Sequence, residues 1–219
     1  WSSDVCSSDL SKLKVVVSDG REGKEAIGYM KAYVNMDVAT LNVGSQPLAN
    51  NAHVKYPDAF GMVSLNDLKT YSVDYAIANE VNAKNVDFKF YCFGASGSPR
   101  LYSMDNTGKD GEFSGSTGKL SAIKVKNLTR FAILSNFDYE NATVASISSE
   151  ILSSSIAQSL LDPIAVGNVI AFRTGGSSAA GGGRIGVMKV INITEPKELV
   201  SNNATARVMT VEIKFPKKK

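Results

Sequence analysis

The sequence predicts an α+β fold, in which an antiparallel sheet and two helices form a C-terminal domain (residues 60–219) behind a β-hairpin. The strongest strand signal is VDFKFYCF at residues 86–93, where the side chains alternate between two faces. Residues 169–173, 184–193 and 206–215 are also rich in β-forming side chains. Their connections are too short to hold a crossover helix, so these segments are expected to pair successively as antiparallel strands.

The first predicted helix follows Ser72, whose side-chain oxygen can accept a hydrogen bond from the first turn. Apolar residues then recur every four positions, at Val73, Ile77 and Val81, and residues 82–85 end the helix.

The second helix is predicted over residues 138–161 and is stopped by Pro163. Its apolar stripe consists of Val144, Ile147, Ile151, Ile156 and Leu160. Both helices are expected to cover one face of the sheet.

Two strands, at residues 13–17 and 26–34, predict a hairpin near the N-terminus. A hairpin alone is marginally stable, so it should be the end of a larger sheet. The stretch VVVSDGREGKEAIGYMKAYV resembles the last two strands of immunoglobulin-like or cadherin-like domains of bacterial surface proteins. This resemblance implies that residues 11–36 are the C-terminal strands of a truncated immunoglobulin-like β-sandwich. Residues 37–59 lack periodicity and are interpreted as a linker.

The first ten residues, WSSDVCSSDL, are excluded from the fold prediction. They match, codon by codon, the translation of a nucleotide string that resembles a common short-read sequencing adapter. The protein is therefore expected to begin near Ser11, without its natural N-terminus and without any signal peptide or lipid-attachment cysteine. Cys6 lies in this stretch, which leaves Cys92 with no partner for an internal disulfide.

Charge and hydropathy limit the partners. The chain has 24 Lys and Arg against 21 Asp and Glu, so no basic face for nucleic acid is predicted. No apolar run approaches the roughly 18 residues of a membrane span. Contact with a membrane is expected only through a missing N-terminal lipid anchor.

Two glycine-rich stretches resemble phosphate-binding motifs. Residues 181–186 satisfy G-x-G-x-x-G, but they precede a predicted strand where a dinucleotide site needs a helix, so a hairpin loop is predicted. Residues 115–120, GSTGKL, have Phe113 in place of the first glycine and Leu120 in place of the magnesium-binding hydroxyl. No cofactor is therefore expected.

Metal and catalytic sites are not predicted either. Residues 105–112 look like a calcium loop, but Lys109 and Ser116 stand where the helix-loop-helix type needs ligands. An irregular calcium site is left as a minor alternative. His53 is the only histidine and lies in the predicted linker, which argues against a Ser-His-Asp site. The acids considered as a glycosidase pair, with no sign that any two converge, are Asp67, Asp74, Glu80 and Asp87.

One candidate binding site is aromatic and consists of Tyr91, Phe93, Arg100 and Tyr102. If these rings are exposed, they offer rigid apolar area beside a cation and can bind a sugar or a protein. In the alternative a helix covers this face of the strand and the rings belong to the core.

Several segments of the C-terminal domain resemble a family of uncharacterised surface lipoproteins from Bacteroidota. They are YSVDYAIAN, VDFKFYCFGASGSPRLYSMD, VGNVIAFRT, GRIGVMKVINI and MTVEIKFPK. The resemblance implies export, tethering by a lost N-terminal lipid and tandem extracellular domains. It implies no catalytic residues.

The sequence therefore predicts a non-catalytic structural or interaction module of a bacterial lipoprotein, anchored at the outer membrane or secreted. The expected partner is a surface glycan or another cell-surface protein. The alternative function is that of a glycan-binding accessory lipoprotein in a polysaccharide-uptake system.

Overall fold

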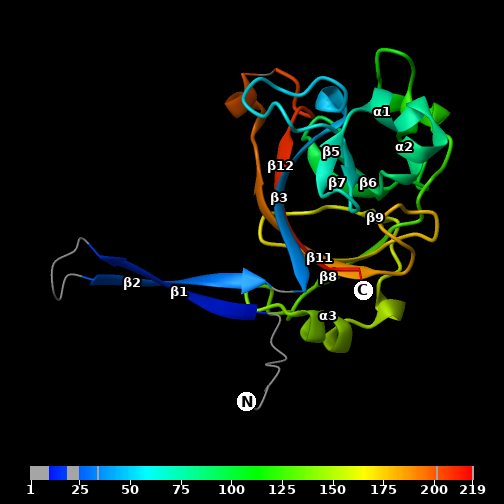
Figure 1. The fold of residues 1–219 in the computed structure, drawn as a ribbon. Helices are drawn as coiled ribbons and strands as arrows, with labels where there is room; N and C mark the ends of the chain where they lie inside the picture. Colours follow the sequence, from blue (N-terminus) through cyan, green and yellow to red (C-terminus); the bar gives the residue numbers. More distant parts are fainter. Residues whose placement is uncertain (1–9, 19–24, 34, 201, 219) are drawn as a thin grey trace.

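The computed structural model describes residues 10–18, 25–33, 35–200 and 202–218 (Figure 1). The adapter-like stretch lies outside these residues except for Leu10, which begins the first strand. Most of the predicted hairpin turn also lies outside them.

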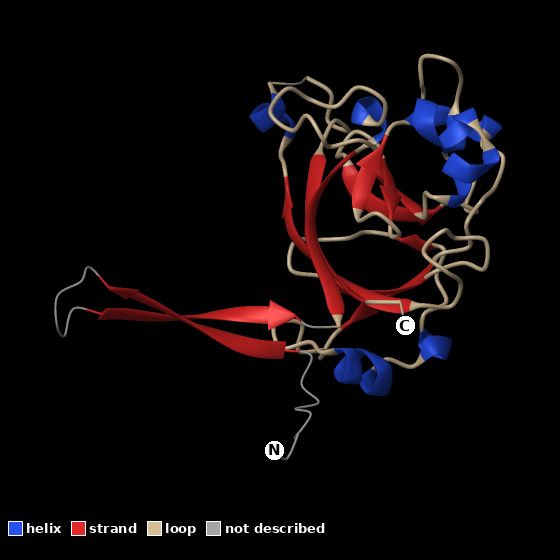
Figure 2. Cartoon of the chain, viewed as in Figure 1, coloured by secondary structure: helices blue, strands red, loops and turns tan. Residues whose placement is uncertain are grey.

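Strands hold more of the chain than helices do, and the helices are short (Figure 2). The strands are β1 Leu10–Ser18, β2 Glu25–Tyr33, β3 Met36–Gly44, β4 Met62–Ser64, β5 Lys69–Tyr71, β6 Phe88–Phe93, β7 Ser98–Ser103, β8 Arg130–Leu134, β9 Leu160–Leu161, β10 Val169–Arg173, β11 Ile185–Ile193 and β12 Val208–Pro216. The helices are α1 Val73–Ala78, α2 Glu80–Lys84 and α3 Val144–Glu150, with short 3-10 turns η1 Gln46–Leu48, η2 Asp110–Glu112, η3 Leu120–Ala122, η4 Ser153–Ser155 and η5 Pro196–Leu199.

The strands β3 to β12 form two antiparallel five-stranded sheets, ordered β3-β12-β11-β10-β8 and β5-β4-β6-β7-β9. Their facing sides share one core, in which Phe88 and Phe90 of the second sheet join Phe131, Phe172 and Phe215 of the first. The α+β class is confirmed. The described part of the domain contains two sheets rather than one, because the β6 region and the C-terminal strands do not pair with each other.

The strand β6 is buried on both faces. Phe88, Phe90 and Cys92 point into the core between the sheets, while Tyr91 belongs to a second cluster with residues of α1 and α2. The predicted alternation is therefore confirmed, but the face interpreted as outer is covered by helices and loops.

The first predicted helix is divided in two. Ser72 caps α1 as predicted, its Oγ accepting a hydrogen bond from the Tyr75 N–H at 3.2 Å. Asn79 then leaves helical geometry and caps α2, its Oδ1 accepting from the Asn82 N–H at 2.9 Å. The third residue of the apolar spacing, Val81, is consequently 76% exposed. An Asn side chain that bonds to the backbone ahead of it favours a new helix start over continuation.

The second predicted helix, residues 138–161, is wrong in extent, because α3 covers only Val144–Glu150. Ile151 is extended, and residues 160–161 pair with β7. The segment is rich in serine, and the hydroxyls of Ser148 and Ser155 donate to the backbone carbonyls of Val144 and Leu152. Such bonds compete with a long helix. The helices also divide between the sheets, since α1 and α2 lie beside the sheet of β6, and α3 lies near β8 and β11 (Figure 1).

The three C-terminal strands are confirmed. They lie next to one another as β10, β11 and β12, all antiparallel. The glycine-rich stretch at residues 181–186 belongs to the β10–β11 connection and the start of β11, as predicted for a hairpin loop. Gly186 is required there, because a Cβ would lie 2.4 Å from Cζ of Phe172.

The predicted linker at residues 37–59 is wrong at its start. Residues 36–44 form the edge strand β3, which pairs with β12 from Met36 opposite Pro216 to Gly44 opposite Val208. Leu41 and Val43 are buried in the core between the sheets, and Ala39 packs against it. This segment therefore belongs to the same sheet as the C-terminus.

The hairpin is confirmed, with β1 and β2 paired from Leu10 opposite Tyr33 to Ser18 opposite Glu25. The two strands form a sheet of their own that extends away from the two larger sheets (Figure 1). The immunoglobulin-like origin of this hairpin stays a prediction. None of the helices in the described part of the chain is long and apolar enough to cross a membrane.

Candidate functional site

The four residues of the predicted aromatic site lie together. The ring of Tyr91 is 5.6 Å from that of Tyr102 and 6.4 Å from that of Phe93, measured between centroids. The guanidinium carbon of Arg100 lies 4.1 Å from the centroid of Phe93. The strand pairing of β6 with β7, which sets Tyr91 opposite Arg100, explains this convergence.

Of the two alternatives that the sequence left open, burial in the core holds for the two tyrosines and exposure holds for Phe93. Tyr91 is 3% exposed and Tyr102 is 4% exposed, whereas Phe93 is 41% exposed. Residues of the 105–120 loop cover Tyr91, with the Phe113 ring 6.0 Å away and Glu112 accepting a hydrogen bond from the Tyr91 hydroxyl at 2.5 Å. Burial, and then this bond, raise the pKa of Tyr91 above its ordinary value. Tyr91 and Tyr102 therefore cannot offer a stacking surface.

Phe93 alone presents an aromatic surface at this place. Arg100 and the Lys109 ammonium, 5.1 Å from the ring centroid, both contact it. Arg100 also forms an ion pair with Asp162 at 2.8 Å. What remains of the predicted site is one exposed ring with two cations close to it.

The carboxylates considered for catalysis have structural partners. Asp74 accepts hydrogen bonds from the backbone N–H groups of Ser116 and Thr117, each at 2.9 Å, and from the Thr117 hydroxyl. These bonds hold the pKa of Asp74 well below its ordinary value. Glu80 pairs with Lys84 on α2 at 2.6 Å.

Asp67 and Asp87 influence each other electrostatically. Asp67 accepts from the Tyr71 hydroxyl at 2.6 Å and from the Asn85 amide at 2.5 Å. Asp87 is fully buried and accepts from the Leu65 N–H at 2.8 Å through Oδ2. Its Oδ1 is buried without a hydrogen-bond partner. The nearby Ser178 hydroxyl favours the charged form of the Asp87 carboxylate and so lowers its pKa. Burial raises the pKa of Asp87 to about 6.

The calcium-like loop has its carboxylates neutralised by cations. Asp105 forms a two-point ion pair with Arg130, at 2.9 and 2.8 Å. Asp110 pairs with Lys89 at 2.8 Å and with Lys126 at 3.4 Å. Within the described ranges no three His, Cys, Asp or Glu side chains are grouped so that they could hold a metal ion. His53 is partly exposed, and its Nδ1 accepts from the Lys55 N–H at 3.2 Å.

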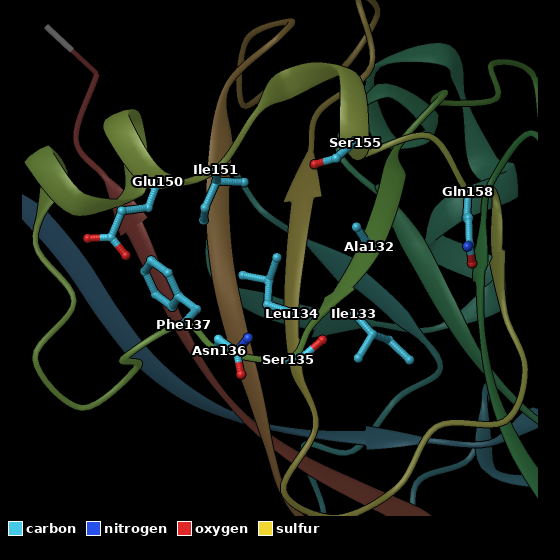
Figure 3. Close-up of a pocket in the computed structure, with 10 residues that line it drawn as sticks. All are labelled: Ala132, Ile133, Leu134, Ser135, Asn136, Phe137, Glu150, Ile151, Ser155 and Gln158. Carbon is cyan, nitrogen blue, oxygen red and sulfur yellow. The ribbon is translucent and has the colours of Figure 1, made fainter.

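A groove that the sequence did not predict lies along the outer edge of β8 (Figure 3). Its volume is about 570 Å³. One wall is β8 with the residues that follow it, including Phe137, and the other is the end of α3 with the chain up to Gln158. We call it the β8 groove.

The edge of β8 is only partly paired. The N–H and C=O of Phe131 exchange hydrogen bonds with Gln158, at 2.8 and 3.1 Å, but this pairing is a single bridge that does not continue to Ile133. In an antiparallel ladder alternate residues point their backbone groups to the same side. The N–H and C=O of Ile133 therefore face the β8 groove, where no backbone partner meets them among the described residues. The Ile133 side chain is 46% exposed. The sequence signal for β8 is the run of β-forming residues RFAIL at positions 130–134. The sequence does not show that this strand lies at the edge of a sheet.

These features define a domain of two antiparallel sheets with an open edge groove. No protein-family model and no curated protein matches the chain. A solved structure with a similar fold is the crystal structure of a DUF4466 family protein from Parabacteroides merdae, with a TM-score of 0.51 and 15% sequence identity. The similarity covers 88% of this chain and 57% of that protein. At this identity it shows the fold, which thus occurs in a member of the Bacteroidota.

Proposed function

We propose that the chain is a non-catalytic interaction module of a bacterial lipoprotein, anchored at the cell surface or secreted, and that it binds an extended segment of another surface protein. The observation that carries the proposal is the half-finished backbone ladder at β8. Edge strands with unpaired N–H and C=O groups are templates for strand addition.

The geometry of the β8 groove favours an extended polypeptide as the occupant. Gln158 already takes the first pairing position, so an added strand would continue from there to Ile133. Backbone bonds would provide affinity, and an apolar side chain of the partner would pack on the exposed part of Ile133 and on Phe137. Glu150 also lines the groove, and it has no ion pair among the described residues. The partner segment is therefore expected to carry a Lys or Arg.

We propose that the chain is non-catalytic because the acids considered for catalysis already form hydrogen bonds or ion pairs within the fold. Asp74 fixes the 115–118 turn, Glu80 pairs with Lys84, and Asp67 accepts hydrogen bonds from Tyr71 and Asn85. The surface location rests on the lipoprotein resemblance of the C-terminal domain.

Binding at the β8 groove is testable with a library of short random peptides. Selected peptides are expected to shift the amide resonances of Ile133 and Ser135 and to protect Ile133 from hydrogen exchange. Ile133→Pro should weaken their binding at least about tenfold, because it removes the donor that an added strand needs. The fold should tolerate this change, since that N–H has no backbone partner in β8–β10 pairing.

Ile133→Val is the matched control, because it keeps both the donor and an apolar side chain. The proposal fails if no peptide perturbs β8, or if the proline and valine variants bind equally well. Turnover of glycosidase or esterase substrates by the wild-type chain would contradict the non-catalytic part separately.

Glycan binding is the second candidate function, and the exposed ring of Phe93 favours it. A sugar can stack on such a ring while Arg100 and Lys109 donate hydrogen bonds or meet an acidic group. This candidate would place the chain in a polysaccharide-uptake system.

Phe93→Ala is expected to lower the affinity for a glycan found on an array by about tenfold, the effect of removing one anchoring aromatic side chain. Ile191→Ala, at a similarly exposed apolar residue of β11, should leave it unchanged. The measurement is calorimetric titration with the array hit. Equal losses in both variants, or an array without hits, would dismiss this function.

A further inference from the structure

A second cavity, of about 620 Å³, lies between α3, the glycine-rich loop and the C-terminal end of β12. Its lining includes Ile147, Gly181, Arg184, Pro216 and Lys218. It shares no lining residue with the β8 groove. We call it the loop cavity.

Arg184 is held in a fixed position beside this cavity. Its Nη1 donates to the Ala180 carbonyl at 2.6 Å, and its Nη2 donates to the Pro216 carbonyl. The guanidinium carbon lies 4.0 Å from the centroid of the Phe215 ring. These contacts fix the plane of the guanidinium and leave its remaining N–H groups for another acceptor, since Arg has five.

The positive charge of the loop cavity is not balanced by the described residues. Arg184 has no carboxylate within ion-pair distance there, and its pKa is lowered by burial, with only Asp37 acting the other way. Asp37 itself pairs with Lys217 at 3.9 Å. Lys218 adds a further cation, so the positive side chains of Arg184, Lys217 and Lys218 lie near one described acidic side chain, that of Asp37.

The stem of Arg184 and the ammonium of Lys218 both lie near Gly181. A Cβ at this glycine would lie 3.4 Å from the Arg184 Cδ and 4.0 Å from the Lys218 Nζ. Gly181 has φ +93°, which favours glycine, so no side chain fills the space beside the Arg184 stem and the Lys218 ammonium. Ile147, Ile185 and Pro216 provide an apolar wall beside this charged end.

We propose that the loop cavity binds a small organic molecule carrying an oxyanion, with the oxyanion between Arg184 and Lys218 and the rest of the molecule against the apolar wall. A planar guanidinium suits the two oxygens of a carboxylate, sulfate or phosphate, and the ammonium adds a point charge. This site is independent of the proposed binding at the β8 groove.

Calorimetric titration of the whole chain with glucuronate, glucose 6-sulfate and glucose 6-phosphate tests the proposal and separates the three oxyanions. At least one should bind, neutral glucose should not, and added salt should weaken the binding. Lys218→Gln should weaken it about tenfold, since it removes a charged donor. Arg184→Gln should weaken it further.

Lys124→Gln provides the matched control, because it removes one exposed lysine charge from a different loop. The Lys218 variant keeps the proposal testable if Arg184→Gln unfolds the loop. The site is excluded if none of the three anions binds at millimolar concentration, if glucose binds equally, or if the Lys124 and Lys218 variants lose the same affinity.

Discussion

Asp110→Asn is expected to lower the free energy of unfolding by about 3–5 kcal/mol, because it leaves a buried charge without its counter-charge. The Lys89 Nζ lies 2.8 Å from the Asp110 Oδ1, and their side chains are 0% and 3% exposed. The same ammonium donates to the Asn106 carbonyl at 2.9 Å. Burial lowers the pKa of Lys89, and the charge of Asp110 opposes this shift. Urea unfolding at pH 7 measures the effect.

Lys126→Gln is the control for this ion pair. Lys126 reaches the same carboxylate at 3.4 Å but is 34% exposed, so its loss should cost less than about 1 kcal/mol. A double variant, Lys89→Met with Asp110→Leu, should recover most of the stability, since well-packed apolar residues can replace a buried ion pair. The interpretation is wrong if Asp110→Asn costs no more than Lys126→Gln.

The Lys89–Asp110 pair also explains why the sequence could not decide whether the aromatic residues are exposed. The alternation at residues 86–93 predicts a strand from local spacing alone, and it puts Lys89 and Tyr91 on one face. Whether that face meets solvent depends on the 105–120 loop, which this ion pair fixes to β6. A loop rich in Gly and Ser carries no periodicity from which such packing could be read.

Pairing between distant strands limited the prediction of the remaining fold. The spacing of Ala39, Leu41 and Val43 contained a strand signal, but the partner of β3 is β12, at the other end of the chain. The C-terminal strands were predictable because each pairs with its neighbour in sequence. The β8 groove depends on β8 being last in its sheet, which follows from the whole strand order.

Asp87 is expected to make the protein more stable as the pH falls from 7.5 to 5. Its side chain is fully buried, and burial raises its pKa from 3.8 to about 6. The folded state therefore holds a proton between these two values that the unfolded state has released. Stability declines as the pH rises through this window, by about 3 kcal/mol in all and by about 1.4 kcal/mol between pH 5 and 7.5.

Asp87→Asn should remove this pH dependence, because the amide stays neutral. Its Oδ1 can still accept from the Leu65 N–H, and its Nδ2 can donate toward Ser178. The variant should thus be more stable than the wild type by about 3 kcal/mol at pH 7.5 and by about half as much at pH 5. Chemical unfolding at both pH values measures the difference, and His53 cancels because both proteins contain it.

Asp74→Asn is the control for Asp87→Asn, because it removes a carboxylate that stays charged between pH 5 and 7.5. Backbone hydrogen bonds keep the pKa of Asp74 below its ordinary value, so its contribution is complete at both pH values and disappears only in stronger acid. That variant should change stability equally at pH 5 and 7.5. If Asp87→Asn also changes stability equally at both pH values, the folded pKa of Asp87 lies near its ordinary value, and its Oδ1 is hydrated rather than buried without a partner.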